Sequence, residues 1–157
     1  MPELRIETSP YDEGVPVKKT SPLAKLPVYG SSGAAAADVC GINETRIHIN
    51  PGCSVVVDTG LQFQVPPGYE LKVYSRSGHG FKSGIRLSNC TGILDSDYRG
   101  NLMVKLHNDS DTVYILEPFE RICQIQIRQA PRYAFVEVEE LDSTERGSNG
   151  FGSTGKV

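Results

Sequence analysis

The fold class is decided by residues 61–73, which read Leu61-Gln62-Phe63-Gln64-Val65-Pro66-Pro67-Gly68-Tyr69-Glu70-Leu71-Lys72-Val73. Apolar and polar residues alternate on both sides of the Pro-Pro-Gly break, and a period of two is that of a β-strand with one buried and one solvated face. The break favours a turn, because proline cannot donate to a sheet ladder and glycine readily adopts left-handed backbone. The stretch therefore predicts two strands joined by a turn.

The same alternation recurs on both sides of this stretch. Further short runs occupy residues 4–6, 55–57, 102–106, 125–127 and 136–138. Sixteen glycines and ten prolines supply turns between such runs. Only residues 77–82 favour a helical turn or two, because the rest of the chain shows no sustained helical period. Many short strands at this spacing predict an all-β sandwich or barrel with at most one short helix.

Length and charge narrow the class of protein further. The chain has 157 residues, which predicts one domain, and a formal net charge of -3. A mildly acidic protein lacks the basic face that a nucleic-acid backbone requires, so we expect no nucleic-acid partner. No apolar run is long enough to span a membrane, and the N-terminus has no apolar signal region. We therefore expect no membrane partner and a cytoplasmic protein that is not secreted, or a nuclear one if the source is a eukaryote or a virus.

The cysteines and histidines do not have the spacing of a metal site. The cysteines form no C-x-x-C pair, so we expect reduced and mostly buried thiols at Cys40, Cys53, Cys90 and Cys123. The histidines are too scattered for a ligand cluster, and we expect ordinary packing or surface residues at His48, His79 and His107.

The last segment differs from the rest of the chain. Residues 146–157 hold four glycines in twelve residues and follow an acidic stretch, so they favour neither strand nor helix. We predict a β domain over residues 1–140 and a mobile, glycine-rich C-terminal arm over residues 141–157. The arm carries an arginine, two hydroxyls and an aromatic ring, a set that suits wrapping a phosphate chain and stacking on a base. A simple flexible tail is the alternative.

Two further segments carry chemically active side chains. Residues 92–100 read Gly-Ile-Leu-Asp-Ser-Asp-Tyr-Arg-Gly and place two carboxylates in a predicted turn between strands. Residues 74–80 place Ser77 directly after an arginine, where it is suited to be the N-cap of a short helix and part of an anion site. Taken alone, an Asp-rich turn and a plain N-cap explain these segments equally well.

In this order, these segments resemble the five motifs of the trimeric deoxyuridine triphosphate nucleotidohydrolases (dUTPases). The resemblance covers residues 34–155, which is most of the chain. The sequence departs from the usual motifs at Ala37, where Tyr is usual, at Ser75, where Pro is usual, and at Asn149, where Gly is usual. The five motifs are Ala34-Ala35-Ala36-Ala37-Asp38-Val39, Arg76-Ser77-Gly78, Asn89 with Gly92–Gly100, Glu120-Arg121-Ile122-Cys123-Gln124, and Arg146–Gly155.

The resemblance implies a reaction and a cofactor. The family hydrolyses dUTP to dUMP and pyrophosphate by water attack at the α-phosphorus, which limits uracil in DNA and supplies dUMP. Such phosphoryl transfer depends on positioning and charge neutralisation. The resemblance implies that Asp95 is the catalytic carboxylate, which aims the water and accepts its proton. It also implies Mg²⁺, held mainly by the phosphates and their waters, with Asp38 as its outer-sphere anchor.

The resemblance also implies the substrate contacts. Asn89 and Gly92 belong to the hairpin that would recognise the uracil edge, and Tyr98 would lie against the deoxyribose and block a 2′-hydroxyl. Phe151 would stack on uracil. The implied phosphate contacts are Arg76, Ser77, Gly78 and Gln124, and, in the closing arm, Arg146, Ser153 and Thr154. Gly152 is a further implied substrate contact of the arm.

The implied fold is a β jelly roll of the β-clip type, and the implied assembly is a homotrimer. Each active site would lie between subunits, and one chain's arm would cover a site formed by another pair. Two alternatives stay open. A dCTP deaminase of the same superfamily would need a catalytic glutamate near the third motif, where this chain has Asp95. A non-enzymatic jelly-roll binding module would leave the glycine-rich arm and the Asp95–Tyr98 cluster unexplained.

Overall fold

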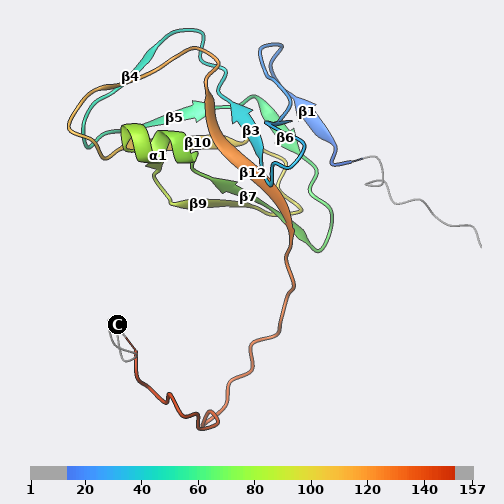
Figure 1. Ribbon diagram of the computed structural model, residues 1–157. Coiled ribbons are helices and arrows are strands. Elements are labelled where there is room, and N and C mark those ends of the chain that lie inside the picture. The colour runs from blue at the N-terminus through green and yellow to red at the C-terminus, as the bar shows by residue number, and fades with distance from the viewer. Residues whose placement is uncertain (1–13, 151–157) are drawn as a thin grey trace, which may run out of the picture.

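The computed structural model describes residues 14–150, and nearly all of its regular elements are β-strands (Figure 1). The predicted all-β class with one short helix is confirmed for this part of the chain. The predicted run at 4–6 lies outside the described residues. Within the described range, no helix is long and apolar enough to cross a membrane.

The largest sheet has five antiparallel strands in the order β2-β3-β12-β7-β9. Its register places Asp38 opposite Gln124 and Gln124 opposite Tyr74. Residues from three distant parts of the sequence therefore meet in the middle of one sheet. The strands are β2 (Val28–Tyr29), β3 (Ala37–Cys40), β7 (Tyr69–Tyr74), β9 (Thr91–Leu94) and β12 (Arg121–Gln129).

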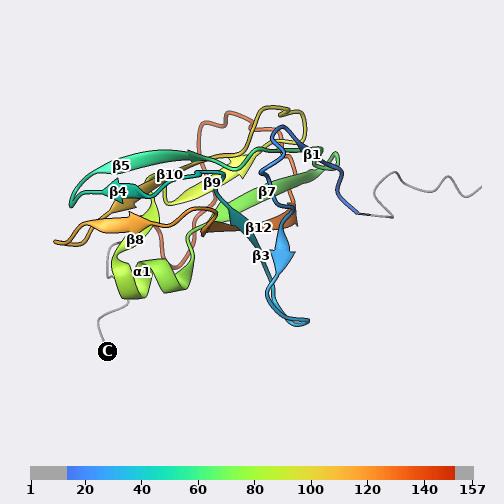
Figure 2. The ribbon, with the colours of Figure 1, turned by 90° about the horizontal axis from the view of Figure 1, so that it is seen from above.

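Three smaller antiparallel sheets complete the fold. Strand β10 lies between β5 and β8, β1 pairs with β6, and β4 pairs with β11. Figure 2 shows β5 on one side of the molecule and β3 and β12 on the other. The strands are β1 (Val17–Lys19), β4 (Ile47–Ile49), β5 (Ser54–Asp58), β6 (Leu61–Phe63), β8 (Ile85–Leu87), β10 (Met103–Asn108) and β11 (Tyr114–Leu116).

The alternation in residues 61–73 is confirmed by burial. The apolar side chains of this stretch enter one core, and each fully buried leucine stabilises the fold by about 1.5–3 kcal/mol. The predicted break is a turn in which Gly68 has a φ of 78° and the Tyr69 N–H donates to the Pro66 carbonyl at 3.1 Å. The buried apolar residues of the stretch are Leu61, Phe63, Val65, Leu71 and Val73.

The helix α1 (Ser77–Ser83) matches the predicted helical turns but not the predicted cap. The prediction that Ser77 is the N-cap is wrong. Arg76 holds that position with extended backbone (φ -81°, ψ 133°), because its carbonyl accepts the first helical hydrogen bond, from Gly80 at 3.0 Å. The helix ends at Ser83, and Gly84, with a φ of 65°, is its left-handed C-cap.

Two other expectations are wrong. Residues 136–138 form no strand, although they alternate, because no neighbouring strand within the described chain pairs with them. Their apolar side chains are largely exposed, with Val136 at 77% and Val138 at 56%. The cysteines are free, as expected, but only Cys123 is buried; Cys53 and Cys90 are exposed.

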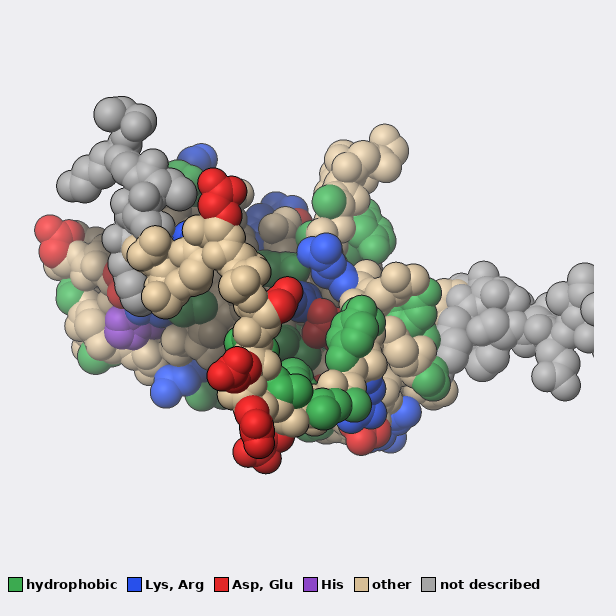
Figure 3. Space-filling view, turned by 90° about the horizontal axis from the view of Figure 1, so that it is seen from below, with side chains coloured by type: hydrophobic (Ala, Val, Ile, Leu, Met, Phe, Trp, Pro, Cys, Tyr) green, Lys and Arg blue, Asp and Glu red, His purple; other side chains and the backbone are tan. Residues whose placement is uncertain are grey.

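Residues 130–150 leave the body of the protein after β12 (Figure 1). Figure 3, seen from below, shows acidic side chains gathered along this extended segment. Large apolar side chains on it are also exposed, including Phe135 at 101% and Leu141 at 86%. In the single chain, the segment therefore presents apolar surface that nothing covers within the described residues.

Candidate active site

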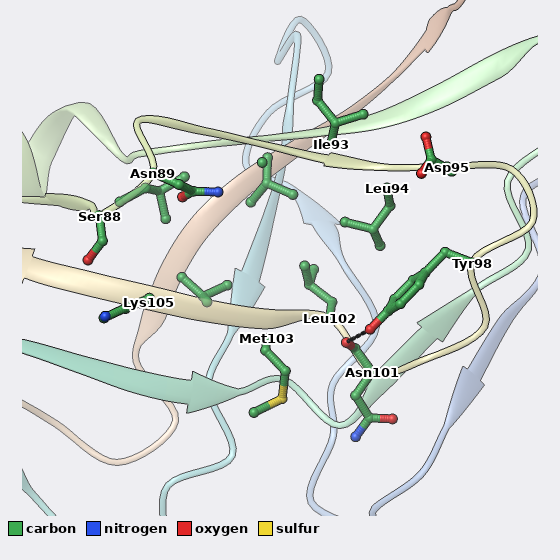
Figure 4. Close-up of a pocket in the computed structure, with 14 residues that line it drawn as sticks. Ser88, Asn89, Ile93, Leu94, Asp95, Tyr98, Asn101, Leu102, Met103 and Lys105 are labelled. Atoms are coloured by element: carbon green, nitrogen blue, oxygen red, sulfur yellow. Dashed lines mark hydrogen bonds between the residues drawn. The ribbon is translucent and has the colours of Figure 1, made fainter.

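A cavity of about 420 Å³ lies between β9 and β10 (Figure 4). Apolar side chains from β7, β8 and β10 form part of its lining, including Val73, Leu87 and Val104. The structure brings four of the residues predicted from the third motif to this cavity: Asn89, Gly92, Asp95 and Tyr98.

The turn that joins β8 to β9, two strands of different sheets, forms one end of the cavity. Cys90 takes a φ of 62° at its tip, and the Thr91 N–H donates to the Asn89 carbonyl at 2.7 Å. Gly92 packs closely against β7, because a Cβ at this position would lie only 3.1 Å from the Cβ of Val73. The turn therefore presents the Asn89 amide and bare backbone to the cavity.

The Tyr98 ring lies at the other end of the cavity (Figure 4). The Tyr98 hydroxyl donates to the Asn101 carbonyl at 3.1 Å, and the Tyr98 backbone N–H donates to the Asp95 carbonyl at 3.1 Å. These bonds fold residues 95–101 into a tight turn. The turn holds the Asp95 backbone and the Tyr98 ring in a fixed relation to each other.

The Asp95 carboxylate lies at the rim of the cavity. It extends from β9 on the same outer side as Ile93, opposite to Leu94 (Figure 4), as the period-two geometry of a strand requires. Both Asp95 and Ile93 are exposed. The carboxylate is therefore open to water and to any group that approaches the outer face of β9.

Three of the predicted phosphate contacts lie at a second cavity, of about 450 Å³. Arg76 and Ser77 reach it from the start of α1, and Gln124 reaches it from β12. Gly78 lies in the same helix but does not line this cavity. Phe81, which was not predicted from the sequence, lines the cavity, and its side chain is 94% exposed. Within the described residues, this cavity shares no lining residue with the first one.

The Asp38 carboxylate lies behind the second cavity and binds two arginine side chains. Its Oδ1 accepts a hydrogen bond from Arg76 Nε at 3.1 Å, and its Oδ2 accepts one from Arg121 Nη1 at 3.0 Å. The carboxylate is nearly buried, with 10% of its side chain exposed. Two guanidinium groups on one carboxylate leave net positive charge, which suits a polyanionic ligand.

The sequence analysis did not find a third polar cluster, behind α1. His79 Nε2 lies 2.8 Å from Glu120 Oε1, and the Tyr114 hydroxyl donates to the same oxygen at 2.6 Å. Burial by itself would raise the pKa of Glu120, but the hydrogen bonds from Tyr114, the Glu117 N–H and His79 outweigh it and lower the pKa. For Tyr114, burial and then the bond to Glu120 raise the pKa. No sequence pattern joins residues so far apart.

The remaining predicted residues lie elsewhere. Arg146 is exposed on the extended segment, where its Nε donates to the Asn149 carbonyl at 3.1 Å, and it lines neither cavity. The other predicted arm contacts lie outside the described residues: Phe151, Gly152, Ser153 and Thr154.

The three departures from the usual motifs have structural counterparts. Ser75 Oγ accepts a hydrogen bond from the Leu87 N–H at 2.9 Å and so ties β7 to β8. Ala37 is buried and lines an apolar cavity of about 580 Å³. Asn149 does not have the positive φ that would favour glycine.

The family model for dUTPase matches residues 23–155. The chain belongs to the dUTPase family. A deoxyuridine 5′-triphosphate nucleotidohydrolase of Fusobacterium nucleatum is 46% identical over 132 residues, which are 84% of this chain and 90% of that one. Membership confirms the resemblance drawn from the five motifs, and with it the class of enzyme, a dUTP diphosphatase.

Solved structures of this family share the fold. The Staphylococcus bacteriophage 80alpha dUTPase, bound to the dUTP analogue dUPNHPP, has a TM-score of 0.82 and 27% identity, and the match covers 91% of this chain and 99% of that one. A D95N mutant of the dUTPase from phage phi11 of S. aureus, described with a structural Mg(II) ion, has a TM-score of 0.70 and 22% identity over 80% of this chain and 97% of that one. The predicted β-rich jelly-roll fold is thereby confirmed.

Proposed function

We propose that the protein hydrolyses dUTP to dUMP and pyrophosphate, with Asp95 directing a water molecule in line onto the α-phosphorus. The observation that carries the proposal is the cavity between β9 and β10, where residues suited to recognise a deoxyuridine lie beside an exposed carboxylate at the rim. A carboxylate open to solvent can orient a water and accept its proton. The reaction would limit uracil in DNA and supply dUMP.

Residues at the two ends of the cavity would recognise the nucleoside, with the base at Asn89 and the sugar at Tyr98. The Asn89 amide offers both a donor and an acceptor, which suits the uracil edge, whereas cytosine reverses that pattern and leaves polar groups unpaired. The narrow space beside Gly92 and Val73 disfavours the extra methyl of thymine. The Tyr98 ring, held by its bond to Asn101, would lie against the deoxyribose and exclude a 2′-hydroxyl.

Recognition of the triphosphate would use the second cavity. Arg76 supplies a planar donor group, and Ser77 and Gln124 add neutral donors beside it. Arg146 and the arm residues beyond it would close over the γ-phosphate and stack on the base. In this scheme the chain contributes positioning and charge, which are the main requirements of phosphoryl transfer.

The separation of the two cavities supports a homotrimer with shared active sites. Asp95 faces outward from one cavity, and the phosphate contacts line another with which it shares no residue of the described chain, so we propose that the second cavity of a neighbouring chain completes the site. The exposed apolar side chains of Phe135, Val136 and Leu141 supply surface for such an assembly. We keep the predicted boundary between the β domain and the arm at residue 140.

Mg²⁺ fits the residues that are present. The described residues contain no cluster of three or more His, Cys, Asp or Glu that could hold an ion. Mg²⁺ commonly binds through substrate phosphates and waters with few protein ligands. Each Asp38 oxygen accepts one guanidinium hydrogen bond and retains capacity to accept one from a metal-bound water. When bound, Mg²⁺ would neutralise charge on the triphosphate, with Asp38 as its outer-sphere anchor. We also propose a cytoplasmic location, in line with the bacterial relative.

A pyrophosphate-release assay with dUTP, dTTP, dCTP and UTP tests the function. We expect release from dUTP alone at an appreciable rate, and an Asp95→Asn variant that binds dUTP but turns over several orders of magnitude more slowly. Asp111→Asn, an exposed aspartate in the loop after β10, is the matched control. Ammonia release from dCTP would favour the deaminase alternative, and no pyrophosphate from any nucleotide would favour a binding module.

A further inference from the structure

His79 is the only buried residue of α1, a helix that lies wholly within the described range. Its ring lies edge-on to Tyr114, with 5.8 Å between the ring centroids. Its Nε2 faces Glu120 Oε1 at 2.8 Å, and the other carboxylate oxygen accepts the Glu117 N–H at 2.9 Å. A histidine on a short, mostly exposed helix is therefore fastened to the segment that precedes β12.

The protonation states in this cluster follow from its hydrogen bonds. The lowered pKa of Glu120 makes it a carboxylate, which can only accept, so His79 Nε2 is the donor. His79 Nδ1 is buried and has no partner among the described residues. The attachment of the ring to Glu120 therefore runs through Nε2 alone.

The same helical turn has a second attachment to the same segment. Arg76 lies one turn before His79, and its Nη1 donates to the Arg121 carbonyl at 3.3 Å. Arg76 and Arg121 also donate hydrogen bonds to the two carboxylate oxygens of Asp38. The first turn of α1 is therefore joined to two consecutive residues, Arg121 through Arg76 and Glu120 through His79.

We propose that His79 is a positioning residue for triphosphate recognition. By holding Glu120, it fixes the first turn of α1 against β12, so that Arg76 and Ser77 stay aligned with Gln124 at the second cavity. The inference rests on the proposed function, because it assigns the phosphate chain to that cavity. It predicts an effect confined to the phosphates, since neither His79 nor Glu120 lines the cavity between β9 and β10.

The test compares two ligands that differ in their phosphates. Binding of dUPNHPP, with Mg²⁺, and of dUMP is measured by calorimetry well below the melting temperature. For His79→Leu we expect dUPNHPP to bind roughly 10- to 100-fold more weakly, by analogy with the loss of hydrogen-bond partners that orient metal ligands, and dUMP to bind as in the wild type. His79→Gln should restore most of the affinity, because its amide can donate where Nε2 does. His48→Gln, at an exposed histidine of β4, is the matched control.

A second measurement needs no nucleotide. Hydrogen exchange of the amides in residues 77–83 should be faster in His79→Leu than in the wild type, and close to wild type in His79→Gln. Equal loss of both ligands in His79→Leu, or no loss of dUPNHPP binding, would overturn the positioning role while leaving the proposed function intact. A wild-type protein that binds neither ligand would overturn both, because the phosphate assignment would then have no basis.

Discussion

Gly100 lies directly against the ring of Tyr98, so close that a Cβ at position 100 would overlap the Tyr98 hydroxyl. The glycine lets the ring fold back far enough for its hydroxyl to reach the Asn101 carbonyl. Tyr98 lines the cavity between β9 and β10, so the shape of that end of the cavity depends on the absence of a side chain two residues further on.

Gly100→Ala should displace the Tyr98 ring and weaken sugar discrimination. Overpacking of this kind costs about 1–3 kcal/mol, which corresponds to roughly a 5- to 150-fold change in an equilibrium. We expect kcat/KM for dUTP to fall and the ratio of dUTP to UTP hydrolysis to narrow. The measurement is kcat/KM for both nucleotides, with Gly33→Ala, where a Cβ meets nothing within 4 Å, as the control. An unchanged ratio would show that Tyr98 does not guard the 2′-position.

Glu120 should contribute stability that depends on pH. Its folded pKa is lowered below the ordinary value of 4.5, so its contribution is fully present above that pH and is lost as the pH falls through the folded pKa. The difference in free energy of unfolding between the wild type and Glu120→Gln should therefore stay constant from pH 7 to 5 and shrink at lower pH. Urea unfolding at pH 7, 5, 4 and 3 measures it. Glu44→Gln, at an exposed glutamate, should show no such trend.

The cysteines should differ sharply in reactivity. Burial, together with nearby Asp38 and Cys40, raises the pKa of the Cys123 thiol to about 12, and only the thiolate reacts. We expect Ellman's reagent to modify the exposed Cys53 and Cys90 in the native protein, and Cys123 only in denaturant. Because Cys90 follows Asn89 in the turn between β8 and β9, dUMP should slow its modification but not that of Cys53. Equal protection of both would place the nucleotide elsewhere.

Two truncations should separate the roles of the C-terminal segments. Deleting residues 146–157 should leave the proposed homotrimer folded, with greatly reduced activity, because the proposed phosphate and base contacts of the arm are lost. Deleting residues 131–157 also removes Phe135, Val136 and Leu141 and should dissociate the proposed homotrimer. Light scattering after gel filtration and the melting temperature distinguish the two outcomes. A large fall in melting temperature on the shorter deletion would instead make residues 146–157 structural.

Local alternation of apolar and polar residues predicted strands correctly where the strand has pairing partners in the same chain. Leu61, Phe63 and Leu71 are buried as expected because β6 and β7 have partners within the fold. Val136 and Val138 alternate in the same way but lack such partners, and alternation cannot reveal that. The expected turn at residues 92–100 begins as strand β9, because pairing with β7 outweighs the weak strand preference of Gly92.

The site was predictable to the extent that its chemistry is local in sequence. Asp95 and Tyr98 lie in one continuous motif, and the structure places both at one cavity. The pairing of His79 with Glu120 was not predictable, because 41 residues separate them and neither has an unusual local setting. Arg121 was visible in the fourth motif, but only the register of β3 against β12 shows that it reaches Asp38.

Asp95 and Arg76 line cavities that have no residue in common within the described chain, so under the proposed scheme a chain that loses one still carries the other intact. Two inactive alleles, one altered at each position, would then complement each other when expressed in the same cell. Some mixed assemblies would bring an unaltered Asp95 from one allele to an unaltered Arg76 from the other. Inheritance of such defects would follow the composition of the oligomer and not the state of any individual gene copy.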